Sequence, residues 1–317
     1  MQPLVSICSI TYNHAPYIRQ CLEGFLMQKT SFPFEIIIND DCSTDGTTEI
    51  IQEYAEKYPD IIKPIFHDEN QYLKGVRGMF ATFCYPRAQG KYIALCEGDD
   101  YWIDPLKLQK QVDILEKSPH VTMVYTGFRT VNMSSNEYSS EVHSQNMYKS
   151  GSGDILKKIM RGNYIQTVTV CFRRDVLINK YIDMAPCHID YLYFLIAAAL
   201  GNVVYIPEAT SAYRINPKGL MCTSKSSVDS SCTQAVIYVF TLLSKKEIRL
   251  SPKQLNRVKI NYFKDAIHYY RIGYKERLNK GLRINGCMCL YAFFACIELA
   301  VEKLPNIITH RFERRKL

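Results

Sequence analysis

The sequence predicts an α/β fold built on a mostly parallel, doubly wound sheet that is flanked by helices. Short apolar runs alternate with helical patterns from residue 5 to about residue 100, which is the order of such a fold. The run at residues 36–38 is too continuous for a half-exposed strand, so we expect it to be buried on both faces. Acidic residues follow two of the runs, at the strand ends where open α/β sheets bind ligands.

The individual elements follow from the spacing of the apolar residues. Residues 5–10 form a first strand, and a helix with apolar residues at helical spacing runs from Tyr17 to about Gln28, with Pro16 near its start. The other expected strands are 34–38, 61–66, 92–96, 121–125, 166–172 and 203–206. The other expected helices are 48–58, a segment before Gly90, a segment after Pro105, 176–181 and the strongly apolar 192–200.

Composition and cysteine usage indicate an ordinary globular protein. At 317 residues the chain exceeds a typical single domain, and its 47% apolar content is ample for a core. The 12 cysteines lie mostly inside apolar runs and include no Cys-x-x-Cys pair, so we expect neither disulfides nor a zinc site. Met1 leads into the first strand pattern without a secretory signal. We therefore expect a reduced, cytoplasmic protein.

The net charge of +8 is concentrated at one end of the chain. Residues 245–317 hold 17 Lys/Arg against 6 Asp/Glu, whereas residues 1–244 hold 22 against 25. This asymmetry predicts a sheet domain at 1–229 and a basic, helical C-terminal region at 230–317.

Residues 287–301 of the C-terminal region are apolar apart from Glu298, and 15 residues are too few to span a bilayer comfortably. Basic residues follow this segment, which favours a helix lying in a membrane surface, at the inner face of the cell membrane. A core helix that covers the sheet domain is the alternative. No nucleic-acid recognition motif accompanies the basic residues.

The most informative stretch follows the expected strand 92–96. It places Glu97, Asp99 and Asp100 within four residues, and Gly98 lets the backbone turn close to a ligand. Carboxylates this close repel one another unless a cation lies between them. Such oxygen ligands suit Mg²⁺ or Mn²⁺, which commonly complete their coordination with water and substrate phosphates. The stretch predicts a metal–diphosphate site, with a solvated acidic turn as the alternative.

Other candidate residues lie at further strand and helix ends. Asp40 and Asp41 follow the strand 34–38 and are expected at the same sheet edge. Asp45 is interpreted as a cap of the next helix. Asp190 begins the apolar helix at 192–200, where it is either a cap or a general base over a donor site. Arg214 offers a donor fork that suits a diphosphate.

With these motifs, residues 3–216 resemble the family 2 glycosyltransferases, an inverting group with the GT-A fold, a Rossmann-like arrangement. Residues 5–7 and 11–13 look like the opening strand and uracil-side turn of that family. Residues 35–47 look like its long Asp-Asp stretch, and residues 97–100 look like its Asp-x-Asp metal motif with one extra Asp.

The sequence departs from the family pattern at a few positions. Asn39 and Cys42 stand where Val and Gly are usual, and we expect these two differences to matter little. Ile10 occupies a position often held by Pro. Asn216 replaces the His of a common Tyr-Arg-x-His ending, so any role of that His is weakened or moved.

The resemblance implies a role for each candidate residue. Asp190 would be the catalytic base, and Asp41 would accept a hydrogen bond from the uracil. The implied metal ligands are Glu97, Asp99 and Asp100, which would hold Mn²⁺ or Mg²⁺. The implied contacts with the nucleotide-sugar are Ile10, Tyr12, Asn13, Asp40, Asp41, Lys74, Asp99 and Arg214.

The implied activity is a metal-dependent sugar transfer with inversion, from a UDP-sugar or another nucleotide-diphosphate donor. The implied acceptor is a hydroxyl of a saccharide or lipid-linked molecule, in the synthesis of bacterial capsule, exopolysaccharide or O-antigen. The competing hypothesis is a non-catalytic nucleotide- or metal-binding scaffold of a membrane complex that assembles polysaccharide. Donor hydrolysis in the absence of an acceptor separates these two hypotheses.

Overall fold

The computed structural model describes residues 2–132, 138–142 and 151–216, apart from residues 161, 184 and 186–188, and several positions between 231 and 242. The chain divides into two compact units, Met1–Ser231 and Cys232–Leu317, and nearly all described residues belong to the first. The expected boundary at residue 229 stays a prediction. The apolar segment 287–301 lies outside the described residues.

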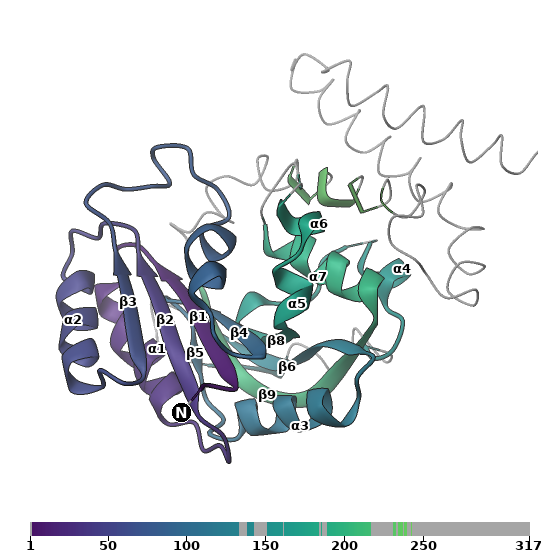
Figure 1. Ribbon diagram of the computed structural model, residues 1–317. Coiled ribbons are helices and arrows are strands. Elements are labelled where there is room, and N and C mark those ends of the chain that lie inside the picture. Colours follow the sequence, from purple (N-terminus) through teal and green to yellow (C-terminus); the bar gives the residue numbers. More distant parts are fainter. Residues whose placement is uncertain are drawn as a thin grey trace, which may run out of the picture. The chain divides into compact units, whose positions relative to one another are not determined.

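One mixed sheet forms the centre of the first unit (Figure 1). Within the described residues, nine strands join it in the order β3-β2-β1-β4-β8-β6-β9-β5, with β7 paired to β6. The strands are β1 (Val5–Thr11), β2 (Phe34–Asp40), β3 (Ile62–Phe66), β4 (Tyr92–Glu97), β5 (Tyr101–Trp102), β6 (Val121–Asn132), β7 (Tyr138–Val142), β8 (Val170–Arg173) and β9 (Asn202–Ile215). Strands β3, β2, β1 and β4 are parallel to one another, and β8 is antiparallel to β4 and β6.

Helices cover both faces of the sheet, which is why its parallel strands are buried. The helices are α1 (Ala15–Leu26), α2 (Thr47–Lys57), α3 (Lys107–Lys117), α4 (Leu156–Ile159), α5 (Arg174–Leu177), α6 (Lys180–Asp183) and α7 (Asp190–Leu200). A π-helical turn η1 (Phe80–Cys84) and two 3₁₀ turns, η2 (Tyr85–Arg87) and η3 (Thr167–Thr169), complete the set. Figure 1 shows α1, α2 and α3 on one side of the sheet and α4 to α7 on the other.

The apolar spacing of each helix decides how it packs. In α1, Ile18, Leu22 and Phe25 are fully buried and form one stripe against the sheet, as the sequence predicts. Helix α7 is buried almost all round, because its eleven residues are nearly all apolar. No helix among the described residues is long and apolar enough to cross a membrane.

Several expected elements differ from the observed ones, and the helix expected at 176–181 is observed as two short helices, α5 and α6. The strand expected at 166–172 begins as the turn η3, because the main-chain N–H and the hydroxyl of Thr169 both donate to the Gln166 carbonyl, at 3.0 and 2.6 Å. The strand expected at 203–206 continues to Ile215, where it pairs with β6 and β5. This longer β9 brings Arg214 beside the acidic turn after β4.

Candidate active site

The carboxyl ends of the parallel strands meet at one edge of the sheet. Ile10 in β1 pairs in register with Asn39 in β2 and with Glu97 in β4. The two acidic groups that follow β2 and β4 therefore flank the end of β1. The structure confirms the expectation that both groups lie at a common edge.

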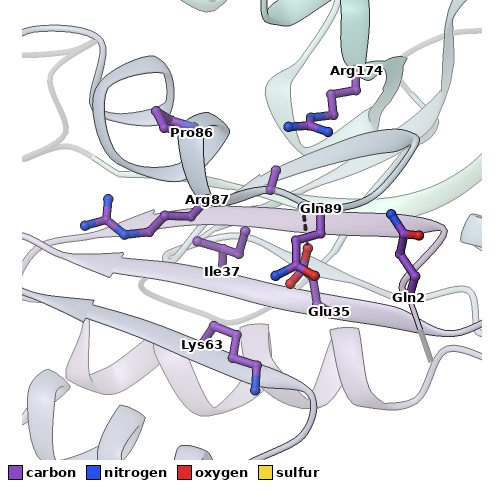
Figure 2. A pocket seen from close by; sticks show the side chains of 9 residues that line it. Gln2, Glu35, Ile37, Lys63, Pro86, Arg87, Gln89 and Arg174 are labelled. Atoms are coloured by element: carbon purple, nitrogen blue, oxygen red, sulfur yellow. Dashed lines mark hydrogen bonds between the residues drawn. The ribbon is translucent and has the colours of Figure 1, made fainter.

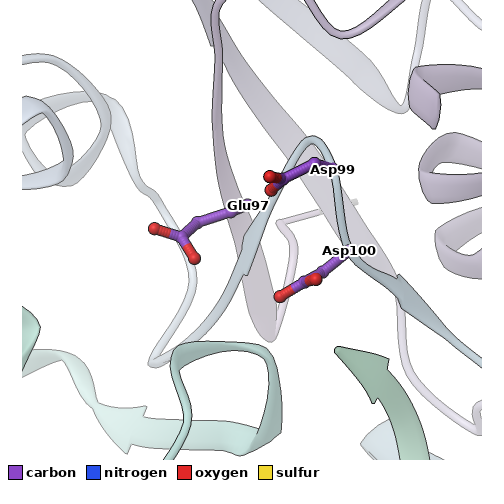
Figure 3. A group of neighbouring side chains, drawn as sticks. All are labelled: Glu97, Asp99 and Asp100. Atoms are coloured by element: carbon purple, nitrogen blue, oxygen red, sulfur yellow. The ribbon is translucent and has the colours of Figure 1, made fainter. Parts of the chain in front are cut away.

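Among the described residues, Glu97, Asp99 and Asp100 form an acidic group that could hold a metal ion. One carboxylate oxygen from each lies within 4.8 Å of the others, grouped around the turn after β4 (Figure 3). The Gly98 N–H donates to the Ile10 carbonyl at 2.9 Å. A Cβ atom at Gly98 would lie 2.6 Å from the Thr11 hydroxyl, so only glycine lets this turn press against β1.

Asp100 is the buried member of this cluster, and Glu97 and Asp99 are half-buried. Asp100 is 1% exposed; its Oδ1 accepts the Arg214 N–H at 2.7 Å, whereas its buried Oδ2 has no hydrogen-bond partner. Burial, and then the charge of Asp99, raise the pKa of Asp100 well above its ordinary value. Burial, together with Asp190, Asp99 and Asp100, raises the pKa of Glu97 in the same way. An unpartnered buried oxygen among repelling carboxylates fits a divalent cation such as Mg²⁺ or Mn²⁺.

Asp190 starts helix α7 and lies close to this cluster. Its charge is the largest electrostatic contribution to the raised pKa of Glu97 after burial. The Thr167 hydroxyl donates to Asp190 Oδ2 at 2.5 Å. Burial raises the pKa of Asp190, and the hydrogen bond from Thr167 opposes that shift. The fold thus places a half-buried, oriented carboxylate beside the acidic turn, although 90 residues separate Asp190 from Asp100 in the chain.

The acidic residues after β2 are in a different situation, because their oxygens are hydrogen-bonded. The Ser43 and Thr48 hydroxyls donate to the two oxygens of Asp40. The main-chain N–H groups of Gln71 and Tyr72 donate to the two oxygens of Asp41, at 2.7 and 3.1 Å. Asp40 thereby ties β2 to the start of α2, and Asp41 ties it to the loop after β3.

The turn after β1 is held by the same region of the chain. Asn13 has a positive φ of 54°, and its side-chain oxygen accepts the Thr44 N–H at 2.8 Å. Tyr12 is 43% exposed at the sheet edge. The carboxylate of Asp45 accepts the N–H groups of Ala15 and Thr47, at 3.0 and 3.1 Å. Asp45 therefore caps the starts of both α1 and α2, which confirms its interpretation as a cap.

The two predicted cationic contacts lie in contrasting surroundings. Lys74 is half-exposed and pairs with Glu69 at 2.7 Å, on the loop that Asp41 anchors. Arg214 is 4% exposed, and its guanidinium donates to the main-chain carbonyl of Asp99 at 2.5 Å and to the Gln20 side chain. These surroundings do not test whether Lys74 or Arg214 contacts a nucleotide-sugar.

Comparison with known proteins now identifies the family. The sequence profile of glycosyl transferase family 2 matches residues 6–178. The chain belongs to glycosyl transferase family 2. An uncharacterized protein of Mycobacterium tuberculosis, Rv1520, is 39% identical over 219 residues, which cover 68% of this chain and 60% of that protein. TuaG of Bacillus subtilis, named as a teichuronic acid biosynthesis glycosyltransferase, is 38% identical over 129 residues, 40% of this chain and 47% of TuaG.

Solved structures of low sequence identity share the GT-A fold of family 2. Staphylococcus aureus TarS 1–349 in complex with UDP-GlcNAc has a TM-score of 0.55 and 16% identity, covering 89% of this chain and 93% of that one. The mannosyltransferase PcManGT of Pyrobaculum calidifontis, in complex with GDP-Man and Mn²⁺, has a TM-score of 0.56 and 16% identity, covering 96% and 88%. The expected fold class is therefore confirmed. The chain itself spans only 60% of the length of the mycobacterial relative.

Two departures from the family 2 pattern have structural consequences. Cys42 stands where Gly is usual, and its φ of 62° is the left-handed conformation that glycine adopts at little cost. Asn39 stands where Val is usual and is fully buried, with its side-chain oxygen 2.7 Å from His67 Nε2 and its Nδ2 without a partner. The left-handed conformation of Cys42 and the unpartnered Nδ2 of Asn39 both cost stability. These two differences therefore matter more than the sequence predicts.

Sequence reasoning missed two residues of the site. His14 Nε2 lies 3.8 Å from Asp99 Oδ2, and burial lowers the pKa of this imidazole. Its place directly after residues 11–13, the turn that follows β1, was an available signal. Thr167 gave no local signal, because its contact with Asp190 arises only from the fold.

A groove of about 710 Å³ lies on the sheet face opposite α1 and α2 (Figure 2). Its lining includes the cations Lys63, Arg87 and Arg174 and the carboxylate of Glu35. The hydroxyl of Ser6 donates to Glu35 Oε1 at 2.6 Å. In Figure 2 the three cationic side chains extend in different directions, so they do not converge on a single compact anion.

Proposed function

We propose that this protein transfers a sugar, with inversion, from a nucleotide-diphosphate donor to a hydroxyl of a saccharide or lipid-linked acceptor. The observation that carries the proposal is the acidic cluster of Glu97, Asp99 and Asp100 with the half-buried Asp190 beside it. These groups lie at the sheet edge where open α/β sheets bind ligands, and the chain belongs to glycosyl transferase family 2.

Asp190 acts in this proposal as the general base. Its carboxylate takes the proton of the acceptor hydroxyl while the hydroxyl oxygen bonds to the anomeric carbon of the donor. The bond between that carbon and the diphosphate oxygen breaks on the opposite face, and the nucleoside diphosphate leaves with the electron pair. One displacement inverts the configuration. Thr167 orients the carboxylate of Asp190 through its hydrogen bond.

Glu97, Asp99 and Asp100 would hold Mn²⁺ or Mg²⁺ in this reaction. When bound, such a cation supplies Lewis-acid neutralisation of the departing diphosphate. The unpartnered Oδ2 of Asp100 supports its assignment as a ligand, because a buried oxygen without a partner is otherwise costly. The hydrogen bond from the Arg214 N–H leaves this second oxygen free to bind the ion.

We propose a UDP-sugar as the donor, with the nucleotide between the two strand tips. TarS was solved with UDP-GlcNAc, whereas PcManGT was solved with GDP-Man, so the base is a matter for experiment. The proposed donor contacts are Ile10, Tyr12, Asn13, Asp40, Asp41, Lys74 and Asp99. Because the two oxygens of Asp41 already accept main-chain N–H groups, a uracil would share these oxygens rather than find them free.

A relative's name and the charge distribution of the chain support the acceptor and the cellular setting of the proposed reaction. TuaG carries a name that refers to teichuronic acid biosynthesis, which supports a surface polysaccharide as the product class. The basic residues at 245–317 support a peripheral position at the inner face of the cell membrane.

Thermal unfolding of the full chain with UDP-, GDP- and dTDP-sugars, each with and without Mn²⁺, tests the donor class. A ligand that binds the native state raises the unfolding midpoint by mass action. We expect one UDP-sugar to raise the midpoint only when Mn²⁺ is present. No shift with any nucleotide would favour the alternative of a non-catalytic scaffold.

Donor turnover separates an enzyme from a scaffold that merely binds nucleotides. We expect the wild-type protein to release UDP from its donor, and Asp190→Asn to lower that rate by about 100- to 10,000-fold while UDP still binds. The exposed Asp60, changed to Asn, is the matched control and should keep the wild-type rate. Wild-type turnover in the Asp190→Asn variant would remove Asp190 from the mechanism.

A further inference from the structure

Arg214 is almost completely buried beside the acidic turn, although a guanidinium keeps its charge at any ordinary pH. It is 4% exposed and lies one residue before the end of β9. Strand β9 pairs with β5, which directly follows Asp100, through the register of Ala212 with Tyr101. This pairing carries Arg214 against the turn that holds the carboxylates.

The hydrogen bonds of Arg214 go to that turn and to α1. Its main-chain N–H donates to Asp100 Oδ1 at 2.7 Å, and its Nη1 donates to the Asp99 carbonyl at 2.5 Å. Its Nη2 donates to the side-chain oxygen of Gln20 in α1. One residue therefore holds the main chain of Asp99 and the side chain of Asp100 at the same time.

Two tyrosine rings lie against the guanidinium. Its central carbon lies 4.4 Å from the centroid of the Tyr101 ring and 5.0 Å from that of the Tyr17 ring. The Tyr101 hydroxyl in turn donates to Tyr138 at 2.9 Å. A diphosphate would have little access to this guanidinium, because Arg214 is 4% exposed, lies against two rings and already donates to two oxygens.

We propose that Arg214 is a positioning residue, which holds Asp99 and Asp100 in the geometry that binds the divalent cation, and not a contact of the donor diphosphate. The bond to Oδ1 orients the Asp100 carboxylate and leaves Oδ2 as its unpartnered oxygen. Asn216, two residues further on, donates to Asp99 Oδ2 at 3.3 Å and supports the same turn. The proposal rests on the proposed function, in which this cluster is the metal site.

Mn²⁺ binding to the full-length chain, followed by electron paramagnetic resonance, tests the proposal in the Arg214→Lys variant. Lysine keeps the charge but loses the planar fork that contacts the Asp99 carbonyl and Gln20 together. We expect the Kd for Mn²⁺ to rise by about 10- to 100-fold, as when groups that orient metal ligands are removed. The affinity for UDP without metal should stay at the wild-type value.

Arg19→Lys is a matched control for the same measurement. Arg19 also lies over a tyrosine ring, Tyr54, and bonds a carboxylate, Glu53, but its side chain is 49% exposed. This control should bind Mn²⁺ as the wild-type protein does. If Arg214→Lys does not fold, Gln20→Ala removes one anchor of the guanidinium and should raise the Kd for Mn²⁺ by about 2- to 5-fold, the effect of one lost hydrogen bond.

The outcomes separate this inference from the proposed function. Wild-type Mn²⁺ affinity in Arg214→Lys, with weaker metal-free UDP binding, would overturn the positioning role and restore the diphosphate contact. Equal Mn²⁺ affinity in Gln20→Ala and the wild-type protein would also count against it. If the wild-type chain itself binds no Mn²⁺, the metal site of the proposed function fails, and the positioning role fails with it.

Discussion

The two acidic strand tips, after β2 and after β4, contain the same kind of residue at the same sheet edge but differ in how their charges are compensated. At the β2 tip, hydroxyl and main-chain donors occupy the oxygens of Asp40 and Asp41. At the β4 tip, Asp100 Oδ2 is buried without a partner, and burial raises the pKa of both Glu97 and Asp100. The oxygens of the β2 tip are already hydrogen-bonded, whereas the β4 tip keeps an unpartnered oxygen that a cation could bind.

This difference indicates that the β2 tip contributes to stability and the β4 tip to function, although both lie at one edge of the sheet. Satisfied carboxylates connect elements, so their loss should lower stability. Unsatisfied carboxylates cost stability, so they persist where they bind something. The sequence alone shows two similar clusters, and only the hydrogen bonds distinguish them.

The largest expected effect comes from Asp100→Asn at the β4 tip. Loss of a charged ligand should lower donor turnover by at least about 100-fold, because a bound cation contributes several kcal/mol to the transition state. The free energy of unfolding without metal should stay equal or rise, since the change removes a buried repulsive charge. Turnover and urea denaturation of the same preparation measure both. A clear loss of stability would make Asp100 a structural residue like Asp40.

The matching change at the β2 tip is Asp40→Asn, which should have the opposite signature. An amide offers a single acceptor oxygen for Ser43 and Thr48, so the free energy of unfolding should fall by about 1.5 to 3 kcal/mol. Urea denaturation measures the loss, and Asp60→Asn is the exposed control. Unchanged stability would mean that the hydrogen bonds to Asp40 make no net contribution to the free energy of unfolding.

Lys107 is a further buried charged residue, and its effect on the free energy of unfolding should depend on pH. Lys107 is fully buried; its Nζ donates to Gln111 and to the carbonyl of Thr169, in the turn that also contains Thr167. Burial lowers the pKa of Lys107 to about 7, below the unfolded value near 10.5. Between these values the unfolded chain binds more protons, so stability should rise with pH, by roughly 2 kcal/mol from pH 7 to pH 9.

Urea denaturation at several pH values checks this rise. The penalty is fully present below pH 7 and disappears as pH approaches the unfolded pKa of Lys107. In Lys107→Met the same pH interval should lack this contribution. If the free energy of unfolding differs between the wild-type protein and Lys107→Met by the same amount at every pH, Lys107 keeps its proton in the core.

The smallest expected effect lies beside the β2 tip, at Cys42. Its positive φ favours glycine, but glycine also gains freedom in the unfolded chain, so Cys42→Gly should raise the free energy of unfolding by roughly 0.5 kcal/mol. Chemical denaturation under reducing conditions measures it. A loss of stability would indicate that the contact of the Cys42 thiol with the Asp68 carbonyl outweighs the backbone strain.

Much of this site could be predicted from sequence because its parts are contiguous. Glu97, Asp99 and Asp100 sit within four residues after an apolar run, and the parallel strands follow from runs such as residues 36–38. The hydrogen bond from Thr167 to Asp190 and the burial of Arg214 arise from distant pairings, including β5 with β9. No local sequence pattern predicts these contacts. The hydrogen bonds that distinguish the two strand tips could not be predicted for the same reason.

The most direct test of the central claim, that the β4 tip holds a divalent cation and the β2 tip does not, is a Mn²⁺ titration of three proteins. Wild type, Asp40→Asn and Asp100→Asn would be titrated as full-length chains at a temperature where all are folded. We expect the first two to bind Mn²⁺ equally and Asp100→Asn to bind it much more weakly. Equal binding by all three, or loss only in Asp40→Asn, would contradict the claim.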